Sequence, residues 1–297
     1  MYNNGKFAIS RFVMNASKTM RIGALVGFIS LFAPVKNVSA QTTVLITSPA
    51  GYSERFKNVF SESQLNPIAI PLIETVIPED MPDVDSLFMN LQQYDYVAFS
   101  SRKAIESFDQ VQKKRNLPLD DIKFCAIGKD AEYMYEKLGV RPAVHPDEPS
   151  PMGIADKLGE DENIGGKTIA VLVPLVEGII EPDVVPNFLA KLSDIGMKVT
   201  RVNAYITRAV DKVQIDEAVK RIASKEIKCI AFTSSAEIEI LLQNTGDKSL
   251  LDNITIACFG PYTAAYAQKR GLNVSVIAQD FSSFSGFLEA IEKYYRK

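Results

Sequence analysis

Hydroxyl residues follow short apolar runs at several points in this 297-residue chain, and their positions suit the binding of a ligand. They are Ser48; Ser100 and Ser101; Thr233, Ser234 and Ser235; and Thr263. Two further runs are followed by Gly128 with Lys129 and by Gly260 with Tyr262. At the start of a helix, hydroxyl groups and unpaired backbone N–H groups hold anions without a positive side chain. The same residue types also serve as ordinary helix caps and turn formers, so both interpretations stay open at each position.

The segments around these residues alternate between expected strands and expected helices. Apolar and β-branched runs predict strands at 43–47, 68–73, 96–99, 123–127, 167–173, 199–206, 229–232 and 255–259, and helical spacing predicts helices at 53–63, 104–112 and 184–195. Such alternation is typical of an α/β fold with mainly parallel sheets covered on both faces. Ligands of these folds bind beyond the carboxyl ends of the strands, where the hydroxyl residues fall. The pattern therefore predicts an anion-binding cleft lined with neutral donors.

The second part of the chain repeats the first. Phe99 and Gly128 are 29 residues apart, and Phe232 and Gly260 are 28 residues apart. Each of these glycines is followed by another after 11 residues, and the next glycines come 14 and 15 residues later. The sequences VAFSSRKAIESF and IAFTSSAEIEIL also match. These spacings predict internal duplication of an α/β unit of roughly 130 residues.

Composition excludes several classes of function. The formal net charge of −3 argues against a nucleic-acid-binding protein that relies on overall positive charge. Cys125, Cys229 and Cys258 form no CxxC pair, so neither a disulfide framework nor a structural zinc site is expected. His145 is the single histidine, which excludes a His-rich metal site. We therefore expect chemistry carried by hydroxyls, carboxylates, amines and backbone amides, without a metal.

Residues 1–41 are expected to form a targeting leader outside the fold. Residues 1–43 contain five Lys or Arg residues and no Asp or Glu. The apolar run at 22–35 is shorter than the about 20 residues of a transmembrane helix, and it precedes the cleavage-like Val38-Ser39-Ala40, as in a signal peptide. A membrane-anchoring helix or an over-extended gene start is the alternative. Without the leader the net charge falls from −3 to −8, because five positive charges leave, so the mature domain is acidic.

Five segments resemble a known enzyme family and occur in its order. They are VAFSSRKAIESF, CAIGKDAEYMYEKLG, VTRVNAYITRAV, IAFTSSAEIEILL and ACFGPYTAAYAQKRGLNVSVIAQDFSSFSGFLEAI. From about Thr43 to the C-terminus the chain resembles uroporphyrinogen-III synthase, a cofactor-free enzyme of tetrapyrrole synthesis. The last segment, with its G-x-x-T-A spacing, is the most diagnostic.

The resemblance implies a two-lobed architecture and a reaction. Two flavodoxin-like lobes with parallel sheets would arise from the duplication and be joined by a two-strand linker near 69–77 and 202–210. One lobe would combine 42–72 with 208–297, the other would span 75–203, and the double crossing would permit hinge opening. The family's reaction converts linear hydroxymethylbilane to cyclic uroporphyrinogen III, with loss of water and inversion of ring D. The only partner implied is this substrate: we expect a monomer that binds no nucleic acid, with no membrane contact of the mature domain.

The resemblance also assigns roles to residues. Tyr205 in NAYIT matches the tyrosine proposed to assist departure of the substrate hydroxyl. We expect its phenol beside the cleft but outside both sheets, and a packing role in the linker strand is the alternative. The positions that hold substrate carboxylates are matched by Ser100, Ser101, Thr233, Ser234, Ser235 and Thr263, and those where the backbone comes close to the ligand by Gly128 and Gly260. The predicted substrate-binding set is completed by Ser48, Lys129 and Tyr262.

The sequence departs from the family pattern in the presumed pocket. Ser48 stands where the first strand often ends in Thr-Arg, and Ala131 stands where a Thr is usual. Tyr262 is bulky for its position. A replacement positive charge would come from Arg102, Lys103 or Lys129.

Two other functional classes compete with the synthase. A two-lobed periplasmic-type binding or sensory protein without catalysis would fit the leader and the hinge. A duplicated flavodoxin-like receiver without activity is disfavoured, because no phosphorylatable Asp follows a strand end in an acidic pocket. The duplicated hydroxyl residues favour the synthase. A tetrapyrrole enzyme with such a leader is expected in a plastid, with a cytoplasmic or exported protein as the alternative.

Overall fold

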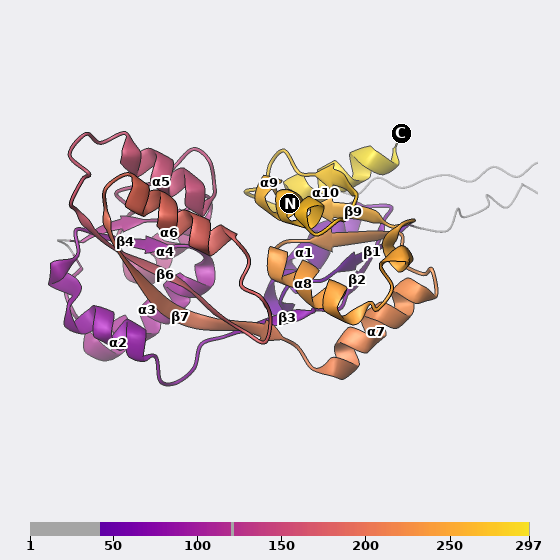
Figure 1. Cartoon of the computed structure of the whole chain (residues 1–297), viewed down its shortest axis with the longest axis horizontal. Coiled ribbons are helices and arrows are strands. Elements are labelled where there is room, and N and C mark those ends of the chain that lie inside the picture. Colours follow the sequence, from indigo (N-terminus) through magenta and orange to yellow (C-terminus); the bar gives the residue numbers. More distant parts are fainter. Residues whose placement is uncertain (1–41, 120–121, 297) are drawn as a thin grey trace, which may run out of the picture. The chain divides into compact units, whose positions relative to one another are not determined.

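The computed structural model describes residues 42–119 and 122–296, which form two five-stranded sheets with helices on both faces (Figure 1). The first sheet has the strand order β10-β9-β8-β1-β2, and its strands are all parallel. The second has the order β3-β7-β6-β4-β5, in which β3 and β7 are antiparallel and the other pairs parallel. The predicted α/β class with parallel-dominated sheets is therefore confirmed. The expected leader lies outside the described residues.

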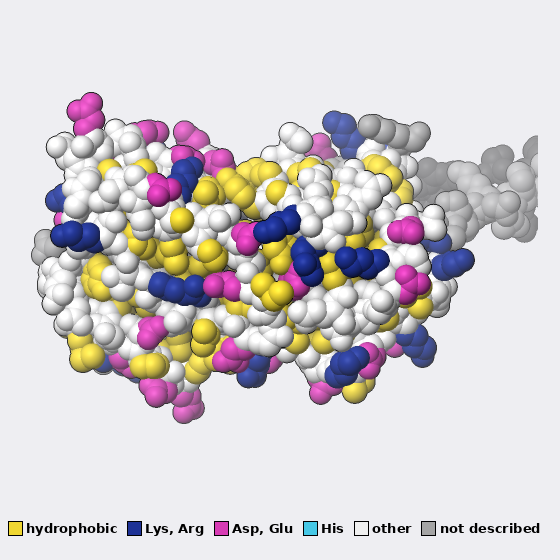
Figure 2. All heavy atoms as spheres, viewed as in Figure 1, with side chains coloured by type: hydrophobic (Ala, Val, Ile, Leu, Met, Phe, Trp, Pro, Cys, Tyr) yellow, Lys and Arg dark blue, Asp and Glu magenta, His cyan; other side chains and the backbone are white. Residues whose placement is uncertain are grey.

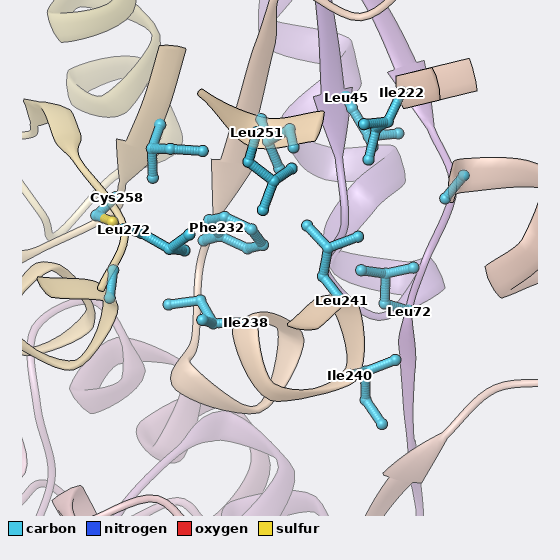
Figure 3. Packing of buried hydrophobic residues seen from close by; sticks show 14 of the residues in the cluster. Leu45, Leu72, Ile222, Phe232, Ile238, Ile240, Leu241, Leu251, Cys258 and Leu272 are labelled. Carbon is cyan, nitrogen blue, oxygen red and sulfur yellow. The ribbon is translucent and has the colours of Figure 1, made fainter. Parts of the chain in front are cut away.

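The first sheet takes its strands from both ends of the described chain. They are β1 (Thr43–Ile46), β2 (Asn66–Ala69), β8 (Cys229–Phe232), β9 (Thr255–Cys258) and β10 (Val274–Ile277). Its helices are α1 (Ala50–Asn58), α7 (Lys212–Ala223), α8 (Ser235–Asn244), α9 (Pro261–Lys269) and α10 (Phe284–Tyr295), with 3-10 turns η1 (Val59–Glu62) and η3 (Lys248–Leu251). Because side chains alternate along a strand, Leu45 packs with the α7 and α8 residues while Val44 packs with those of α1 and α10. Figure 3 shows Leu45, Phe232 and Leu241 in the first of these clusters.

The second sheet is built from the middle of the chain. Its strands are β3 (Ile73–Val76), β4 (Tyr96–Phe99), β5 (Lys123–Cys125), β6 (Thr168–Glu177) and β7 (Lys198–Ala209). Its helices are α2 (Pro82–Met89), α3 (Arg102–Arg115), α4 (Asp130–Leu138), α5 (Pro151–Gly159) and α6 (Val184–Asp194), with one 3-10 turn, η2 (Leu91–Gln93). Phe99 packs with α2, α3 and α4, whereas Ala98 packs with α5 and α6. Both faces are thus buried, as the continuous apolar run of β4 predicts.

Serine residues cap three of these helices. Ser101 Oγ accepts a hydrogen bond from the backbone N–H of Ala104 at 3.3 Å, at the start of α3. Ser150 and Ser283 cap α5 and α10 in the same way, with distances of 3.1 Å. The capping interpretation and the ligand-binding interpretation of a hydroxyl are therefore not exclusive, because a capping oxygen still has a proton to donate.

The extended segment predicted at 68–73 is divided between two strands of different sheets. β2 ends at Ala69 and β3 begins at Ile73, with Pro71 between them. A proline has no backbone N–H to donate and therefore interrupts a ladder of strand hydrogen bonds. β3 then runs antiparallel to the end of β7, with Ile73 opposite Ala209. The lobe limits, the linker and the duplication stay predictions.

The described surface carries both signs of charge. On the face seen in Figure 2, acidic and basic side chains are interspersed rather than gathered into one basic patch. Among the described residues, no helix has the length and apolar content that a membrane span requires.

Candidate active site

A cavity of about 360 Å³ lies beyond the carboxyl ends of strands from both sheets. β4 of the second sheet ends at Phe99, and β8 and β9 of the first sheet end at Phe232 and Cys258. Residues that follow all three strands line the cavity, as expected at the carboxyl ends of parallel strands. The sequence-predicted residues that line the cavity are Ser100, Ser101, Tyr205, Thr233, Ser234, Ser235, Gly260, Tyr262 and Thr263.

Three predicted residues are placed elsewhere. Ser48 is fully buried, and its Oγ lies 3.1 Å from the Oγ of Ser53 in α1. Gly128 and Lys129 border a separate cavity of about 620 Å³, in which the Gly128 carbonyl lies 3.2 Å from His145 Nε2. A substrate role for these three residues stays a prediction.

Tyr205 lies within β7, where it is opposite Pro174 of β6. The expectation that its phenol stands outside both sheets is wrong, because the pairing of β6 and β7 resumes after a register shift and continues to Arg208. The Tyr205 side chain is nearly buried and lines the cavity. Ser101 Oγ donates a hydrogen bond to Tyr205 Oη at 2.9 Å. Because the same Oγ caps α3, the helix start holds the serine against the phenol.

The environment of Tyr205 keeps its phenol protonated. Burial raises the pKa of Tyr205 to about 12, and the hydrogen bond from Ser101 opposes this rise. Since Ser101 donates to the phenol oxygen, the phenolic proton is left for another acceptor. Tyr205 can therefore donate a proton or a hydrogen bond into the cavity.

Of the three residues expected to supply a replacement positive charge, only Lys103 lines the cavity. Lys103 lines the cavity, with its Nζ 2.6 Å from Glu106. Arg102 pairs with Asp130 at 3.0 Å and does not line the cavity, nor does Lys129. Of the three, Lys103 is therefore the one placed to meet an anion there.

The hydroxyl residues after β8 donate to a carboxylate of the chain itself. Thr233 Oγ1 and Ser234 Oγ donate to Glu237 Oε1 at 2.6 and 2.9 Å. Glu237 Oε2 accepts from Thr47 Oγ1 at 2.6 Å and from the Thr233 N–H at 3.0 Å. Glu237 is fully buried in the cavity wall, and burial raises its pKa while these hydrogen bonds oppose the rise.

Aromatic side chains form part of the remaining wall. Tyr52, Phe259 and Phe281 line the cavity. A Cβ at Gly260 would lie 3.2 Å from the Phe281 ring, so glycine allows a close approach between this backbone and the ring. Tyr262 Oη donates to Glu148 at 2.5 Å, and Thr263 is buried at the start of α9.

Comparison with known proteins agrees with this geometry. A family model described as Uroporphyrinogen-III synthase HemD matches residues 54–287. The chain belongs to the uroporphyrinogen-III synthase family. A uroporphyrinogen-III synthase from Chlorobaculum parvum is 24% identical over 260 residues, which are 84% of this chain and 97% of that protein. The crystal structure of a mutant uroporphyrinogen III synthase from Thermus thermophilus has a similar fold, with a TM-score of 0.60 at 15% identity over 86% of this chain and 99% of that one.

The resemblance predicted from the five sequence segments is thus confirmed. The cavity wall of this member of the uroporphyrinogen-III synthase family also holds residues that the sequence did not single out, among them Glu237 and Tyr52. Glu237 follows Ser234 by three residues, and this spacing is the capping-box signal, which would have marked the carboxyl group. Tyr52 carries no such signal, because its surroundings include Phe284, far away in the sequence, at 6.4 Å between ring centroids.

Proposed function

We propose that the chain converts hydroxymethylbilane to uroporphyrinogen III, with inversion of ring D and loss of water, and so acts as a cyclising hydro-lyase of tetrapyrrole synthesis. Membership of the uroporphyrinogen-III synthase family supports this reaction. The observation that carries it is a protonated phenol, Tyr205, in the wall of a cavity lined with hydroxyl groups.

The proposed chemistry starts at the hydroxymethyl carbon of the substrate. Its C–O bond breaks, the oxygen takes the Tyr205 proton and leaves as water, and a resonance-stabilised cation remains. Ring D then attacks this carbon through the ring position that already carries its bridge to ring C. The bridge bond breaks and re-forms at the free position of ring D, which inverts the ring, and the proton displaced there restores the phenol. Holding the chain folded so that ring D reaches this carbon is the larger part of the task, because positioning alone contributes strongly to such a rate.

An acidic protein can hold the eight carboxylates of this substrate through neutral donors. Helix starts offer backbone N–H groups and the favourable end of the helix dipole. In the cavity wall, such starts are provided by α3 after Ser101, by α8 after Ser234 and by α9 after Gly260. Lys103 adds one positive charge. The substrate-binding roles that we propose for the predicted residues lining this cavity rest on this arrangement.

The test is an assay of the full chain with freshly made hydroxymethylbilane. The type III product is separated from the type I product, and a reaction without protein serves as the control. We expect the protein to make type III in excess. Type I alone, at the rate of the control, would exclude the synthase, and binding without turnover would favour the non-catalytic binding protein.

We further propose that residues 1–41 direct the protein to a plastid. The basic, acid-free composition of this segment and its apolar run support a targeting role. A fusion of residues 1–45 to a fluorescent reporter is expected to enter plastids, whereas the reporter alone stays in the cytosol. A diffuse cytosolic signal from the fusion would refute the proposal.

A further inference from the structure

The hydroxyl groups of Thr233 and Ser234 both donate their hydrogen bonds to the carboxylate of Glu237. Both donate to its Oε1, at 2.6 and 2.9 Å. A hydroxyl has one proton, so in this arrangement each of them turns lone pairs towards any other neighbour. Lone pairs repel a carboxylate. The Thr233 and Ser234 hydroxyls are therefore unable to hold a substrate carboxylate while Glu237 is ionised.

Among the described residues, the Glu237 carboxylate is surrounded by hydrogen-bond donors but has no ion-pair partner. Its side chain is fully buried, and no Lys or Arg of residues 42–119 or 122–296 pairs with it. Thr47 and the Thr233 N–H supply the other two hydrogen bonds. Burial of a carboxylate without a cation is costly and favours the neutral form, which is the direction in which burial shifts the pKa of Glu237.

We propose that Glu237 is a positioning residue that couples the binding of the substrate to its own protonation. When the carboxyl takes up a proton, the Thr233 and Ser234 hydroxyls turn to donate to a substrate carboxylate in the cavity. No bond of the substrate changes in this step, and one proton moves from water to Glu237. The inference rests on the proposed function, because it takes the bound anion to be a carboxylate of hydroxymethylbilane.

The titratable groups around Glu237 do not replace it in this role. On β9, burial and then the charge of Glu237 raise the pKa of the Cys258 thiol to about 12, so it stays neutral. On β8, burial raises the pKa of the Cys229 thiol as well. Glu239 on the same helix contacts Tyr266 of α9 and Arg270. The charged side chains of α7, α9 and β3 that form ion pairs do so with residues other than Glu237. These pairs are Lys212–Asp216, Arg221–Glu217, Lys269–Asp183 and Glu74–Arg208. Lys220 of α7 is exposed, and the cavity wall also carries Lys103, Tyr205 and Tyr262.

Glu237→Gln should fix the protonated arrangement. With the amide oxygen in place of Oε2, it still accepts from Thr47 and from the Thr233 N–H. The amide nitrogen then donates to the Thr233 and Ser234 oxygens, which frees both hydroxyl protons. We expect the variant to lower the KM for hydroxymethylbilane by about tenfold or more at about pH 8, the effect of one hydrogen bond to an ionised group, with little change in kcat.

The pH profile separates this role from a purely structural one. Between about pH 6 and pH 8.5 the substrate carboxylates are ionised, so the wild-type KM should rise with pH, by up to about tenfold per unit for one coupled proton, while that of Glu237→Gln stays flat. A glutamine side chain can take part in the same hydrogen bonds, so a purely structural Glu237 would leave KM and its pH profile unchanged in the variant. That result would overturn the proposal. Glu239→Gln, which removes a buried carboxylate two residues along α8 and outside the cavity wall, is the control and should keep the wild-type profile.

Two further measurements keep the proposal testable. If Glu237→Gln does not fold, Ser234→Ala should raise KM more at about pH 6 than at about pH 8.5, because the hydroxyl donates to substrate only when Glu237 is protonated. An equal effect at both pH values would overturn the coupling.

The ligand-free protein supplies a readout without synthase activity. The raised pKa of Glu237 adds stability below the unfolded value of about 4.3, and this is lost as pH rises through the folded value. The difference in melting temperature, wild type minus Glu237→Gln, should therefore fall as the pH rises from about 4.3 through the folded-state pKa of Glu237. A constant difference would overturn the inference, whereas the expected fall in a protein without synthase activity would overturn only the proposed function.

Discussion

Tyr205→Phe is expected to lower kcat by about 10²–10⁴-fold, the usual contribution of a general acid, and to change KM by less. The substitution removes the phenolic proton that Ser101 leaves available to the cavity. The ring should keep its place, because Tyr205 belongs to the buried cluster of the second sheet together with Phe99 and Val202. The measurement is a comparison of kcat and KM for hydroxymethylbilane, with the melting temperature determined alongside.

Tyr266→Phe is a suitable control for this variant. It also removes a phenolic hydroxyl from a nearly buried tyrosine, but that hydroxyl donates to Glu239 at 2.8 Å, and Tyr266 does not line the active-site cavity. We expect the control to lose stability without losing turnover. If Tyr205→Phe lowers kcat by only a few-fold and lowers the melting temperature as well, Tyr205 has a packing role. An unchanged rate would remove it from the mechanism.

The fold class was accessible from the sequence because the strands are short, uninterrupted apolar runs. The segments 96–99 and 229–232 coincide with β4 and β8, since strands buried on both faces contain four consecutive apolar residues. The prediction of one strand at 68–73 was wrong because the apolar run is interrupted. Pro71 cannot donate a hydrogen bond to a strand ladder, and after it the chain enters the other sheet. The position of Tyr205 inside a sheet depends on how far β6 and β7 stay paired, which no local pattern of residues records.

The candidate site was accessible to the extent that strand ends define it. Ser100 follows β4 of the second sheet, Thr233 and Gly260 follow β8 and β9 of the first, and all three line the cavity beyond the carboxyl ends of these strands. What each hydroxyl donates to depends on contacts distant in the sequence. Thr47 and Glu237 are 190 positions apart, and their hydrogen bond joins the end of β1 to the start of α8. Alternation of strands and helices predicts the edge, but the direction of a single proton depends on the packed structure.

Phe108→Ala is expected to lower the free energy of unfolding by about 3–5 kcal/mol, the range for removing a fully buried phenylalanine ring. Phe108 of α3 is completely buried among three other rings. The centroid distances are 4.5 Å to Phe88, 5.4 Å to Phe99 and 5.7 Å to Phe124. The loss is measured by urea denaturation of the wild type and the variant at one temperature.

The size of this loss depends on whether the surrounding rings can move into the space. Phe99 and Phe124 belong to the hydrogen-bonded strands β4 and β5, which hold them in place, so the space left by the ring should stay largely unfilled.

Two variants serve as controls. Phe108→Leu, which retains most of the apolar volume, should lower the free energy of unfolding by less. Tyr294→Ala, at a half-exposed position, should change the free energy of unfolding by no more than about 0.5 kcal/mol. A loss below about 1 kcal/mol for Phe108→Ala would mean that α2 and α3 collapse onto the sheet. Since Ser100 and Ser101 connect Phe99 to α3, such a collapse would also move the hydroxyl that contacts Tyr205. The kcat of the folded variant therefore distinguishes a rigid core, for which we expect little change, from one that repacks.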